Sequence, residues 1–317
     1  MNHNSITCIL TFRNEGIEVE KTIESILNTS LNTDILLIDD DSDDGYDYES
    51  LMEKYPVYYL RNKERKGVAE SRNIGVAHSV TPYCLLLDAH MRFYEQRWET
   101  ELIKYLNEFP ESIICSKTVV IHKNEDGTYE NEDGKKRSTG LGATINLDWN
   151  KERCFRHAWS YDNTRNKPHE NLMEIPCVLG AAYAFRKDWW NKIRGLDGLI
   201  VYGLDEALMS IKTWMFGGKC YLKTDWNVGH IYRKEMPFVV TPTHVGFNEY
   251  MLANLFVNST EELNCYLNNI KKRLSSTTVQ TIEKMFTDKQ LYFDEYKKFI
   301  EENTKMSFDD FRKNINK

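Results

Sequence analysis

The sequence lacks the surplus of positive charge that a general nucleic-acid-binding protein needs. Its 317 residues carry 41 lysines and arginines against 48 acidic residues, a formal net charge of −7, so there is no basic excess to neutralise phosphates. It also lacks an apolar run near the ~20 residues of a membrane span and the basic and apolar regions of a signal peptide. We expect a cytoplasmic protein that binds no nucleic acid and has no membrane span. Peripheral membrane association and the oligomeric state stay open.

Cysteine is present, but not in the spacings of a disulfide framework or a zinc site. The seven cysteines stand at positions 8, 84, 115, 154, 177, 220 and 265 and never form a Cys-x-x-Cys pair. An odd, scattered set of this kind predicts reduced thiols in the core. The remaining composition, with 41% hydrophobic and 28% charged residues, is ordinary for a globular enzyme, and the length allows a large core.

Strand-like and helix-like segments alternate over the first ninety residues. Strands are predicted at 5–12, 34–38, 57–60 and 83–87, with helices at 17–27 and 67–80. This alternation predicts a parallel, doubly wound α/β sheet. In such sheets ligands bind beyond the carboxyl ends of the strands. Thr11, residues 39–41 and residues 88–90 all lie at those ends, which is the first indication of a functional site.

The rest of the chain predicts a second sheet region followed by helices. We expect helices at 98–107, 187–193 and 205–216, strands at 112–121 and 179–186, and a mobile loop or exposed hairpin at 122–140. Beyond residue 247, amphipathic helices pack on the core or on a partner, with apolar positions at Ile282, Met285, Phe286, Phe293, Tyr296 and Ile300. We therefore divide the chain into a catalytic domain, 1–246, and a helical extension, 247–317. The first has a nucleotide-binding half at about 1–95 and an acceptor-side half at about 96–246.

An apolar run leads directly into an Asp-x-His step at residues 84–90. In an extended strand, side chains two residues apart point to the same side, so Asp88 and His90 can converge on one ion. His230 is a candidate third ligand, with Arg233 near enough to contact a diphosphate. A carboxylate combined with imidazole suits a transition metal such as manganese better than magnesium, which prefers a site made of oxygen ligands. The alternative is a strand followed by a polar turn, with structural histidines.

Three further charged groups each have a functional and a structural interpretation. The acidic cluster that contains Asp39 and Asp40 either caps the following helix or accepts a hydrogen bond from the imide N–H of uracil. Arg65 precedes a helix N-terminus, where it belongs either to an anion site or to a solvated basic face. Asp205 and Glu206 either cap their helix or deprotonate an acceptor hydroxyl.

Taken in order, these motifs resemble known glycosyltransferases. Residues 11–16 (TFRNEG), 38–45 (IDDDSDDG) and 67–75 (GVAESRNIG) resemble glycosyltransferase family 2, with its GT-A nucleotide-sugar fold. The later motifs resemble the polypeptide N-acetylgalactosaminyltransferase branch of that fold: DAH at 88–90, GAAYAFR at 180–186, WW at 189–190, GLD at 195–197, YGLDE at 202–206, WMFGG at 214–218 and GHIYR at 229–233. The resemblance covers residues 5–235 and implies a doubly wound, mostly parallel sheet.

The resemblance implies a role for each matched residue. The residues that it implies for nucleotide binding are Thr11, Arg13, Glu15, Asp39 or Asp40, Arg65, Arg72, Asp88 and Arg233. Asp88, His90 and His230 would hold Mn²⁺ or Mg²⁺, which bridges the donor diphosphate. Gly180, Tyr202 and Asp205 would face the donor sugar, and Asp205 and Glu206 would be the catalytic carboxylates.

Two departures from the family patterns leave finer points open. Most family 2 members have Asp-x-Asp where this chain has Asp88-Ala89-His90, which ties the chain to a subset. The carboxylate pair is Asp205-Glu206, whereas the two branches have Glu-Asp or Glu-Asn. Which carboxylate acts, and whether the reaction retains or inverts the anomeric centre, therefore stays open.

Together, the motifs predict a metal-dependent glycosyltransferase that moves N-acetylhexosamine, galactose or glucose from a UDP-sugar. The acceptor is a hydroxyl of a carbohydrate such as a polysaccharide repeat, of a lipid-linked sugar or of a protein. Two alternatives are a nucleotidyltransferase, for which residues 12–16 lack the Gly-rich phosphate loop, and a non-catalytic nucleotide- or carbohydrate-binding protein with a relict site. Residues 232–246, with two prolines and no periodicity, form a candidate lid over the donor.

Overall fold

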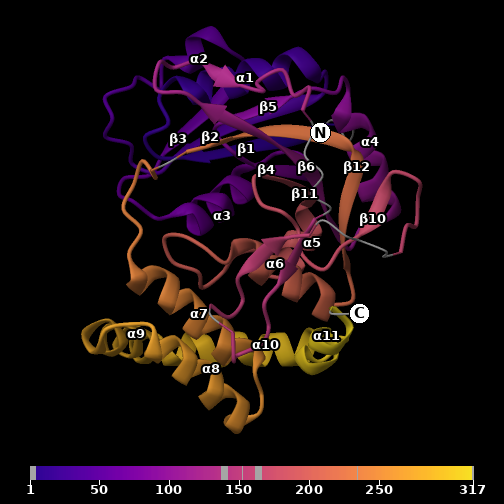
Figure 1. Cartoon of the computed structure of the whole chain (residues 1–317). Helices are drawn as coiled ribbons and strands as arrows, with labels where there is room; N and C mark the ends of the chain where they lie inside the picture. Colours follow the sequence, from indigo (N-terminus) through magenta and orange to yellow (C-terminus); the bar gives the residue numbers. More distant parts are fainter. Residues whose placement is uncertain (1–4, 137–141, 152, 161–165, 234, 316–317) are drawn as a thin grey trace.

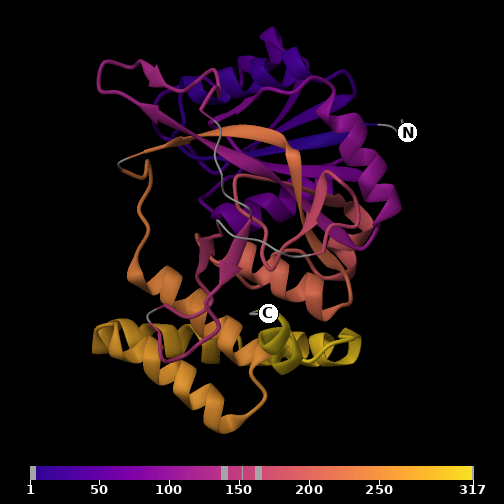
Figure 2. The ribbon, with the colours of Figure 1, turned by 45° about the vertical axis from the view of Figure 1, so that its right-hand side comes forward.

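The computed structural model describes residues 5–136, 142–151, 153–160, 166–233 and 235–315. A mixed sheet crosses the molecule, with α1 (Ile17–Thr29) and α2 (Leu51–Lys54) above it in Figure 1 and α3 (Val68–His78) and α6 (Asp205–Met215) below it. The helices that end the chain form a further layer beneath α6 in both views (Figures 1 and 2). The site lies in the sheet part of the molecule.

The first four strands form the parallel half of the sheet. They are β1 (Ile6–Phe12), β2 (Thr33–Asp39), β3 (Val57–Arg61) and β4 (Tyr83–Asp88). β1 lies between β2 and β4, β3 pairs with β2, and all three pairings are parallel. The register pairs Thr11 with Asp88 and Phe12 with Asp39. The predicted strands and their parallel order are confirmed here, and their carboxyl ends meet at one edge.

Alternating side chains of these strands fill two separate hydrophobic clusters. Cys8 and Leu10 of β1 lie in the cluster that contains apolar residues of α1 and of α4 (Trp98–Glu108). Ile9, between them, lies in the cluster that contains residues of α3 and α6. Because neighbouring side chains of a strand point to opposite faces, the sheet is covered by helices on both sides. The chain is therefore doubly wound, as predicted.

The later strands make the other half of the sheet mixed. They are β5 (Met91–Phe93), β6 (Ser112–Lys123), β7 (Tyr129–Glu130), β10 (Leu172–Glu174), β11 (Ala182–Arg186) and β12 (Lys219–Tyr232). β11 is antiparallel to both β4 and β6, whereas β12 is parallel to β6 and antiparallel to β5 and β10. The expectation of a mostly parallel sheet therefore holds for the N-terminal half, and the complete sheet is mixed.

β12 is a long strand that periodicity does not predict. A register shift between Lys223 and Asn227 interrupts its pairing with β6. Lys223 is buried there and forms ion pairs with Glu101 and Asp225. A bulge of this kind breaks the alternation of apolar and polar residues on which strand prediction depends. This strand matters because it carries His230 into the site.

The polar segment that follows β6 is partly a hairpin. His122 and Lys123 of β6 pair with Glu130 and Tyr129 of β7, which confirms the exposed hairpin for this part of the expected 122–140 segment. Residues 137–140 lie outside the described residues. A second, two-stranded sheet follows, made of β8 (Ala143–Ile145) and β9 (His157–Trp159), which sequence analysis did not predict.

The last five helices pack on the lower face of the sheet part. They are α7 (Pro242–Phe256), α8 (Thr260–Lys272), α9 (Ser276–Asp288), α10 (Gln290–Asn303) and α11 (Phe308–Ile315). Buried residues of α9 and α10, such as Ile282 and Phe293, belong to the same hydrophobic cluster as residues of α6. These helices therefore pack on the core of their own chain.

The expected boundary at residues 246 and 247 falls inside α7, because this helix already begins at Pro242. Thr241 caps it by accepting a hydrogen bond from the backbone N–H of His244. The division into domains stays a prediction. The helix expected at 187–193 is present as α5 (Lys187–Lys192), which follows β11 in the chain.

Two further features can be compared with the sequence-based expectations: the cysteines and the length and polarity of the helices. All seven cysteines are free, and six of them are buried, as expected for core thiols. None of the helices within the described ranges is both long and apolar enough to cross a membrane.

Candidate active site

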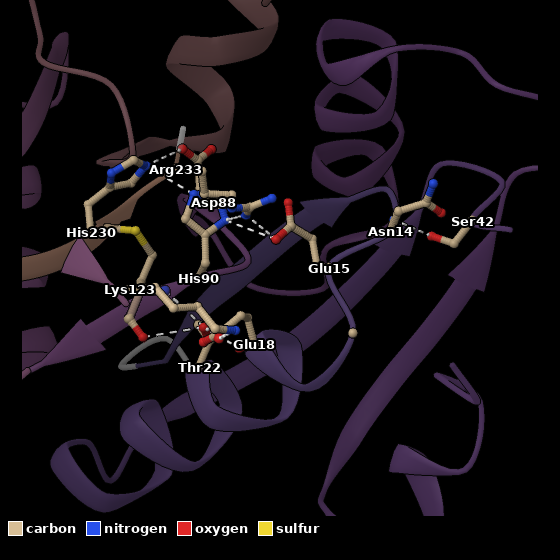
Figure 3. Close-up of polar contacts among 12 residues, drawn as sticks. Asn14, Glu15, Glu18, Thr22, Ser42, Asp88, His90, Lys123, His230 and Arg233 are labelled. Carbon is tan, nitrogen blue, oxygen red and sulfur yellow. Dashed lines mark hydrogen bonds and ion pairs between the residues drawn. The ribbon is translucent and has the colours of Figure 1, made fainter. Parts of the chain in front are cut away.

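Asp88, His90 and His230 lie together, although His230 is far from the other two in the sequence. Asp88 ends β4, and His230 of β12 pairs with Met91 of β5, next to His90. The Nε2 atoms of His90 and His230 are 3.1 Å apart, and His230 Nε2 is 3.3 Å from Asp88 Oδ2. Figure 3 shows the three side chains turned toward one another. The structure therefore brings the three predicted metal ligands into one group.

The chemistry of this group fits a divalent transition metal. One ligand atom from each of the three residues lies within 4.8 Å of the others. Burial alone would raise the pKa of Asp88, but the hydrogen bond from His230 and the charge of Arg72 outweigh it and lower that pKa. Burial lowers the pKa of His230. A carboxylate with neutral imidazoles is a donor set that manganese or zinc accepts.

Arg233 and Glu15 surround His90 on the side away from Asp88. Arg233 forms an ion pair with Glu15 and lies beside Nδ1 of His90, which is itself 3.2 Å from the Glu15 carboxylate. Burial favours a raised pKa for Glu15, but His90 and Arg233 lower it, so the carboxylate stays charged. Figure 3 shows Arg233 between His90 and Glu15. The guanidinium is therefore held beside the three candidate ligands.

A cavity of about 280 Å³ opens from this group toward the parallel half of the sheet. We call it the nucleotide-side cavity; Thr11, Arg13, Glu15, Asp40 and Arg65 are among its lining residues. The hydroxyl of Thr11 is buried and has no hydrogen-bond partner among the described residues. A buried hydroxyl without a partner is costly, so Thr11 has capacity to bind a ligand.

Asp40, in the acidic cluster, lines the nucleotide-side cavity and also binds the segment before α3. Its carboxylate accepts hydrogen bonds from the backbone N–H groups of Lys66 and Gly67 and from the side chain of Asn62. It therefore holds the two residues that precede α3 and occupies backbone donors that an anion would otherwise use. Because a carboxylate offers about four acceptor positions, one stays available to the cavity.

Two residues predicted to contact the nucleotide do not line this cavity. Asp39 is fully buried, and its carboxylate accepts from Tyr59, Arg61 and the backbone N–H of Ser42. Arg72 is 3% exposed and lies on the other side of Asp88. We correct both assignments: of the alternatives Asp39 and Asp40, the structure favours Asp40, and Arg72 supports other residues of the site.

Arg72 links two carboxylates that face different parts of the site. Its Nη2 is 2.9 Å from Asp88 Oδ1, and its Nη1 is 2.8 Å from Asp205 Oδ2. Burial raises the pKa of Asp205, which Arg72 partly offsets. Since all three side chains are held in this way, Arg72 fixes the position of Asp205 relative to the candidate metal ligands.

The segment expected to act as a lid lies over the nucleotide-side cavity. Met236, Pro237 and Phe238 line it. Arg65 donates a hydrogen bond to the carbonyl of Val239 at 2.9 Å and lies 5.3 Å from the ring of Phe238. Arg65 therefore contacts the cavity and this segment together. Movement of the segment stays a prediction.

A second cavity, of about 270 Å³, lies on the other side of Asp88 and His230. We call it the transfer-side cavity; it is lined by Gly180, Asp205 and Glu206, with Tyr202 at the border of both cavities. A β-carbon at Gly180 would lie 2.1 Å from Oε1 of Glu206, so a larger residue would displace this carboxylate. The predicted donor-sugar and catalytic residues therefore line one cavity, beside the candidate metal ligands.

Sequence analysis missed two further residues of the site, His157 and Trp159, and gave Tyr232 no role beyond the matched motif and the candidate lid. Tyr232 lines both cavities, and His157 and Trp159 of β9 line the transfer-side cavity. His157 and Trp159 are two residues apart, which is a weak strand signal. Nothing in the sequence connects them with Glu206, which is their neighbour only in the folded chain.

Comparisons with known proteins agree with this arrangement. Residues 7–193 match the model of the family described as Glycosyl transferase family 2. The chain is 27% identical over 244 residues to polypeptide N-acetylgalactosaminyltransferase 4 of Caenorhabditis elegans, covering 73% of this chain and 39% of that protein. It is 30% identical over 241 residues to polypeptide N-acetylgalactosaminyltransferase 10 of Homo sapiens, covering 73% and 38%. The chain thus spans about two fifths of the length of these relatives.

Two solved structures share its fold. The crystal structure of GalNAc-T7 with UDP, GalNAc and Mn²⁺ superposes with a TM-score of 0.74 at 22% identity, covering 98% of this chain and 57% of that one. S. aureus TarS 1-349 in complex with UDP-GlcNAc gives a TM-score of 0.54 at 10% identity, covering 84% and 71%. These likenesses confirm the GT-A fold. Because the family model matches more than half of the chain, this protein belongs to glycosyl transferase family 2.

Proposed function

We propose that this chain is a metal-dependent glycosyltransferase that transfers a sugar from a UDP-sugar to an acceptor hydroxyl. The observation that carries the proposal is the position of Asp88 and His230, which line both cavities. A sugar nucleotide has a nucleotide and a sugar on either side of a diphosphate, and two cavities that meet at a metal-binding group match that order. Membership of glycosyl transferase family 2 supports the same activity.

The donor we propose is a UDP-sugar carrying an N-acetylhexosamine, with galactose and glucose as further candidates. Two structures of the same fold hold UDP with GalNAc, and UDP-GlcNAc. In the nucleotide-side cavity, Thr11, Arg13, Asp40 and Arg65 would bind the uridine portion. Arg233 would place a positive charge beside the diphosphate, because Glu15 already holds its guanidinium there.

The transfer-side cavity would hold the donor sugar and the reacting hydroxyl. Asp88, His90 and His230 would bind Mn²⁺ or Mg²⁺, which when bound supplies positive charge to the departing diphosphate. Of the two candidate carboxylates, Asp205 is 3% exposed and engaged by Arg72. Glu206 lines the same cavity without that ion pair, so we assign it to the acceptor side. The acceptor, whether carbohydrate, lipid-linked or protein, and the cytoplasmic location stay predictions.

The first test is a screen of UDP-GalNAc, UDP-GlcNAc, UDP-galactose and UDP-glucose for Mn²⁺-dependent hydrolysis, measured as released UDP. His90→Ala should lower the rate about 100-fold or more, because one of three ligands is lost, and should weaken Mn²⁺ binding in calorimetry. His78→Ala, a change at an exposed histidine of α3, is the matched control and should behave like the unchanged protein.

The same screen, together with a parallel assay of nucleoside triphosphates, separates the alternatives. Hydrolysis that is equal with and without His90 would exclude the metal assignment. A protein that binds UDP but hydrolyses none of the four donors would favour a non-catalytic binding protein. Release of pyrophosphate from a nucleoside triphosphate in place of UDP from a UDP-sugar would favour a nucleotidyltransferase.

A further inference from the structure

The two carboxylates at the start of α6 have different partners. Asp205 is bound to the buried guanidinium of Arg72. Glu206, the next residue, has its Oε2 atom 3.6 Å from Nδ1 of His157. The side chains of His157 and Glu206 are 31% and 14% exposed, and both line the transfer-side cavity. A carboxylate and an imidazole thus stand together where the proposed function needs a proton acceptor.

Backbone contacts keep this pair together. His157 on β9 pairs with Ile145 of β8. In the same hairpin, the N–H of Ala143 donates to the carbonyl of Cys177 at 3.2 Å. The thiol of Cys177 in turn lies 3.7 Å from the backbone oxygen of Glu206. The hairpin that carries His157 and the start of α6 are therefore both attached to the segment around Cys177.

The geometry favours one protonation pattern of the imidazole. A carboxylate near Nδ1 stabilises the proton on that nitrogen and leaves the lone pair on Nε2. This is the relation between base and orienting carboxylate that recurs in enzymes that activate a hydroxyl. The present separation of 3.6 Å exceeds a hydrogen bond, but such contacts are often long before substrate binds.

We propose, resting on the glycosyltransferase function above, that His157 is a catalytic residue that takes the proton of the attacking hydroxyl. Glu206 is then a positioning residue that acts through His157. In the step, the hydroxyl oxygen bonds to the anomeric carbon, and its proton moves to Nε2 of His157. The bond from the anomeric carbon to the diphosphate oxygen breaks, and its electron pair leaves with UDP. The partly exposed imidazole then releases the proton to water.

Hydrolysis of the UDP-sugar tests this without a known acceptor, because water takes the place of the hydroxyl. His157→Gln should lower kcat by about 100-fold or more, within the range of general-base catalysis. KM and the affinity for UDP with Mn²⁺, measured by calorimetry, should stay unchanged. In His157→Ala, added imidazole should restore turnover in proportion to its concentration. Glu206→Gln should also lower kcat and leave UDP affinity unchanged.

The matched control is His169→Gln, because His169 also faces a glutamate, Glu108, at 2.8 Å, but lines neither cavity. It should retain full turnover. A His157→Gln protein as active as the control would overturn the proposal and leave the glycosyltransferase function intact. So would a folded His157→Ala protein, checked by circular dichroism, whose lost activity imidazole does not restore. If the unchanged protein hydrolyses no UDP-sugar, both proposals fail together.

Discussion

The two cavities that meet at Asp88 and His230 are assembled in different ways. The nucleotide-side cavity takes half of its polar residues from the segments around the ends of β1 and β2 and the start of α3. The transfer-side cavity takes His157, Gly180 and Glu206 from three segments that only the folded chain brings together. Parallel strands fix the relative position of residues at their ends. The second cavity depends instead on long-range packing.

The charges of the two cavities also differ. On the nucleotide side, Arg233 is already paired with Glu15, so the cationic group is preorganised. On the transfer side, Glu206 and His157 are only loosely paired. Arg72 is the connection, since it binds Asp88 and Asp205 at once. Substitutions can therefore be chosen that affect both cavities, the transfer side alone, or the nucleotide side alone.

Arg72→Met should have the largest effect on the folded protein, because it disrupts the connection itself. It leaves Asp88 and Asp205 without the cation that both contact. Removing one partner of a buried ion pair costs about 3–5 kcal/mol. We expect the free energy of unfolding, measured with urea in metal-free buffer, to fall by that amount.

The control for this change is Lys284→Met, which removes an exposed ion pair with Asp288 on α9. Such a surface pair contributes about 0.5 kcal/mol or less, so the unfolding curve should hardly move. If the two variants lose equal free energies of unfolding, the ion pairs of Arg72 contribute no more to stability than an exposed pair.

Gly180→Ala should affect the transfer side and spare the nucleotide side. The added β-carbon would lie 2.1 Å from Oε1 of Glu206, which must move away. A displacement near 1 Å can lower turnover by about 100-fold. UDP hydrolysis should fall by 10-fold to about 100-fold, while calorimetry should find unchanged binding of UDP with Mn²⁺.

A double-mutant cycle tests the cause of that loss. In a Glu206→Ala background, there is no carboxylate to displace, so Gly180→Ala should add no further loss of turnover. If the two losses simply multiply, the effect of the alanine reaches the site by some route other than Glu206.

The comparison of the two cavities also shows which parts of the fold and of the site can be predicted from the sequence. The strands β1 to β4 and the meeting of Asp88 with Thr11 follow from apolar runs and from the rule for parallel sheets. His230 was a candidate ligand from its position after a short apolar stretch, and motif resemblance supported it, because the bulge in β12 hides that strand. Periodicity does not predict a side chain whose position depends on contacts between segments far apart in the sequence, and His157 is an example.

Charged residues were the other source of error. Arg72 and Asp39 stand in matched motifs, and a charge near a predicted site suggests contact with the ligand. In the folded chain both are buried, and their hydrogen bonds go to protein groups. The sequence gives the charge of a residue but not the hydrogen-bond partners that the residue needs when it is buried. A charged residue that contacts the ligand therefore cannot be told from one that supports a ligand-binding residue.

Thr11→Val should give the smallest change and separates the nucleotide side from the fold. The Thr11 hydroxyl has no hydrogen-bond partner among the residues that the structure describes. Replacing it with a methyl group removes an unsatisfied polar group, so the free energy of unfolding should rise by about 1 kcal/mol. If the hydroxyl binds the nucleotide, the affinity for UDP should fall about fivefold, equivalent to a hydrogen bond of about 1 kcal/mol.

Thr7→Val on the same strand provides the opposite case. The Thr7 hydroxyl is buried and lies 2.8 Å from that of Thr81, which itself donates to the carbonyl of Tyr83, so the same substitution there removes a buried hydrogen bond. It should lower the free energy of unfolding by about 1 kcal/mol and leave UDP binding unchanged, because Thr7 does not line the nucleotide-side cavity. In urea unfolding, the two variants should therefore change the free energy of unfolding in opposite directions. In UDP calorimetry, only Thr11→Val should change the affinity. Should Thr11→Val destabilise the protein as Thr7→Val does, its hydroxyl serves the fold, and the nucleotide-side cavity loses its clearest free hydrogen-bonding group.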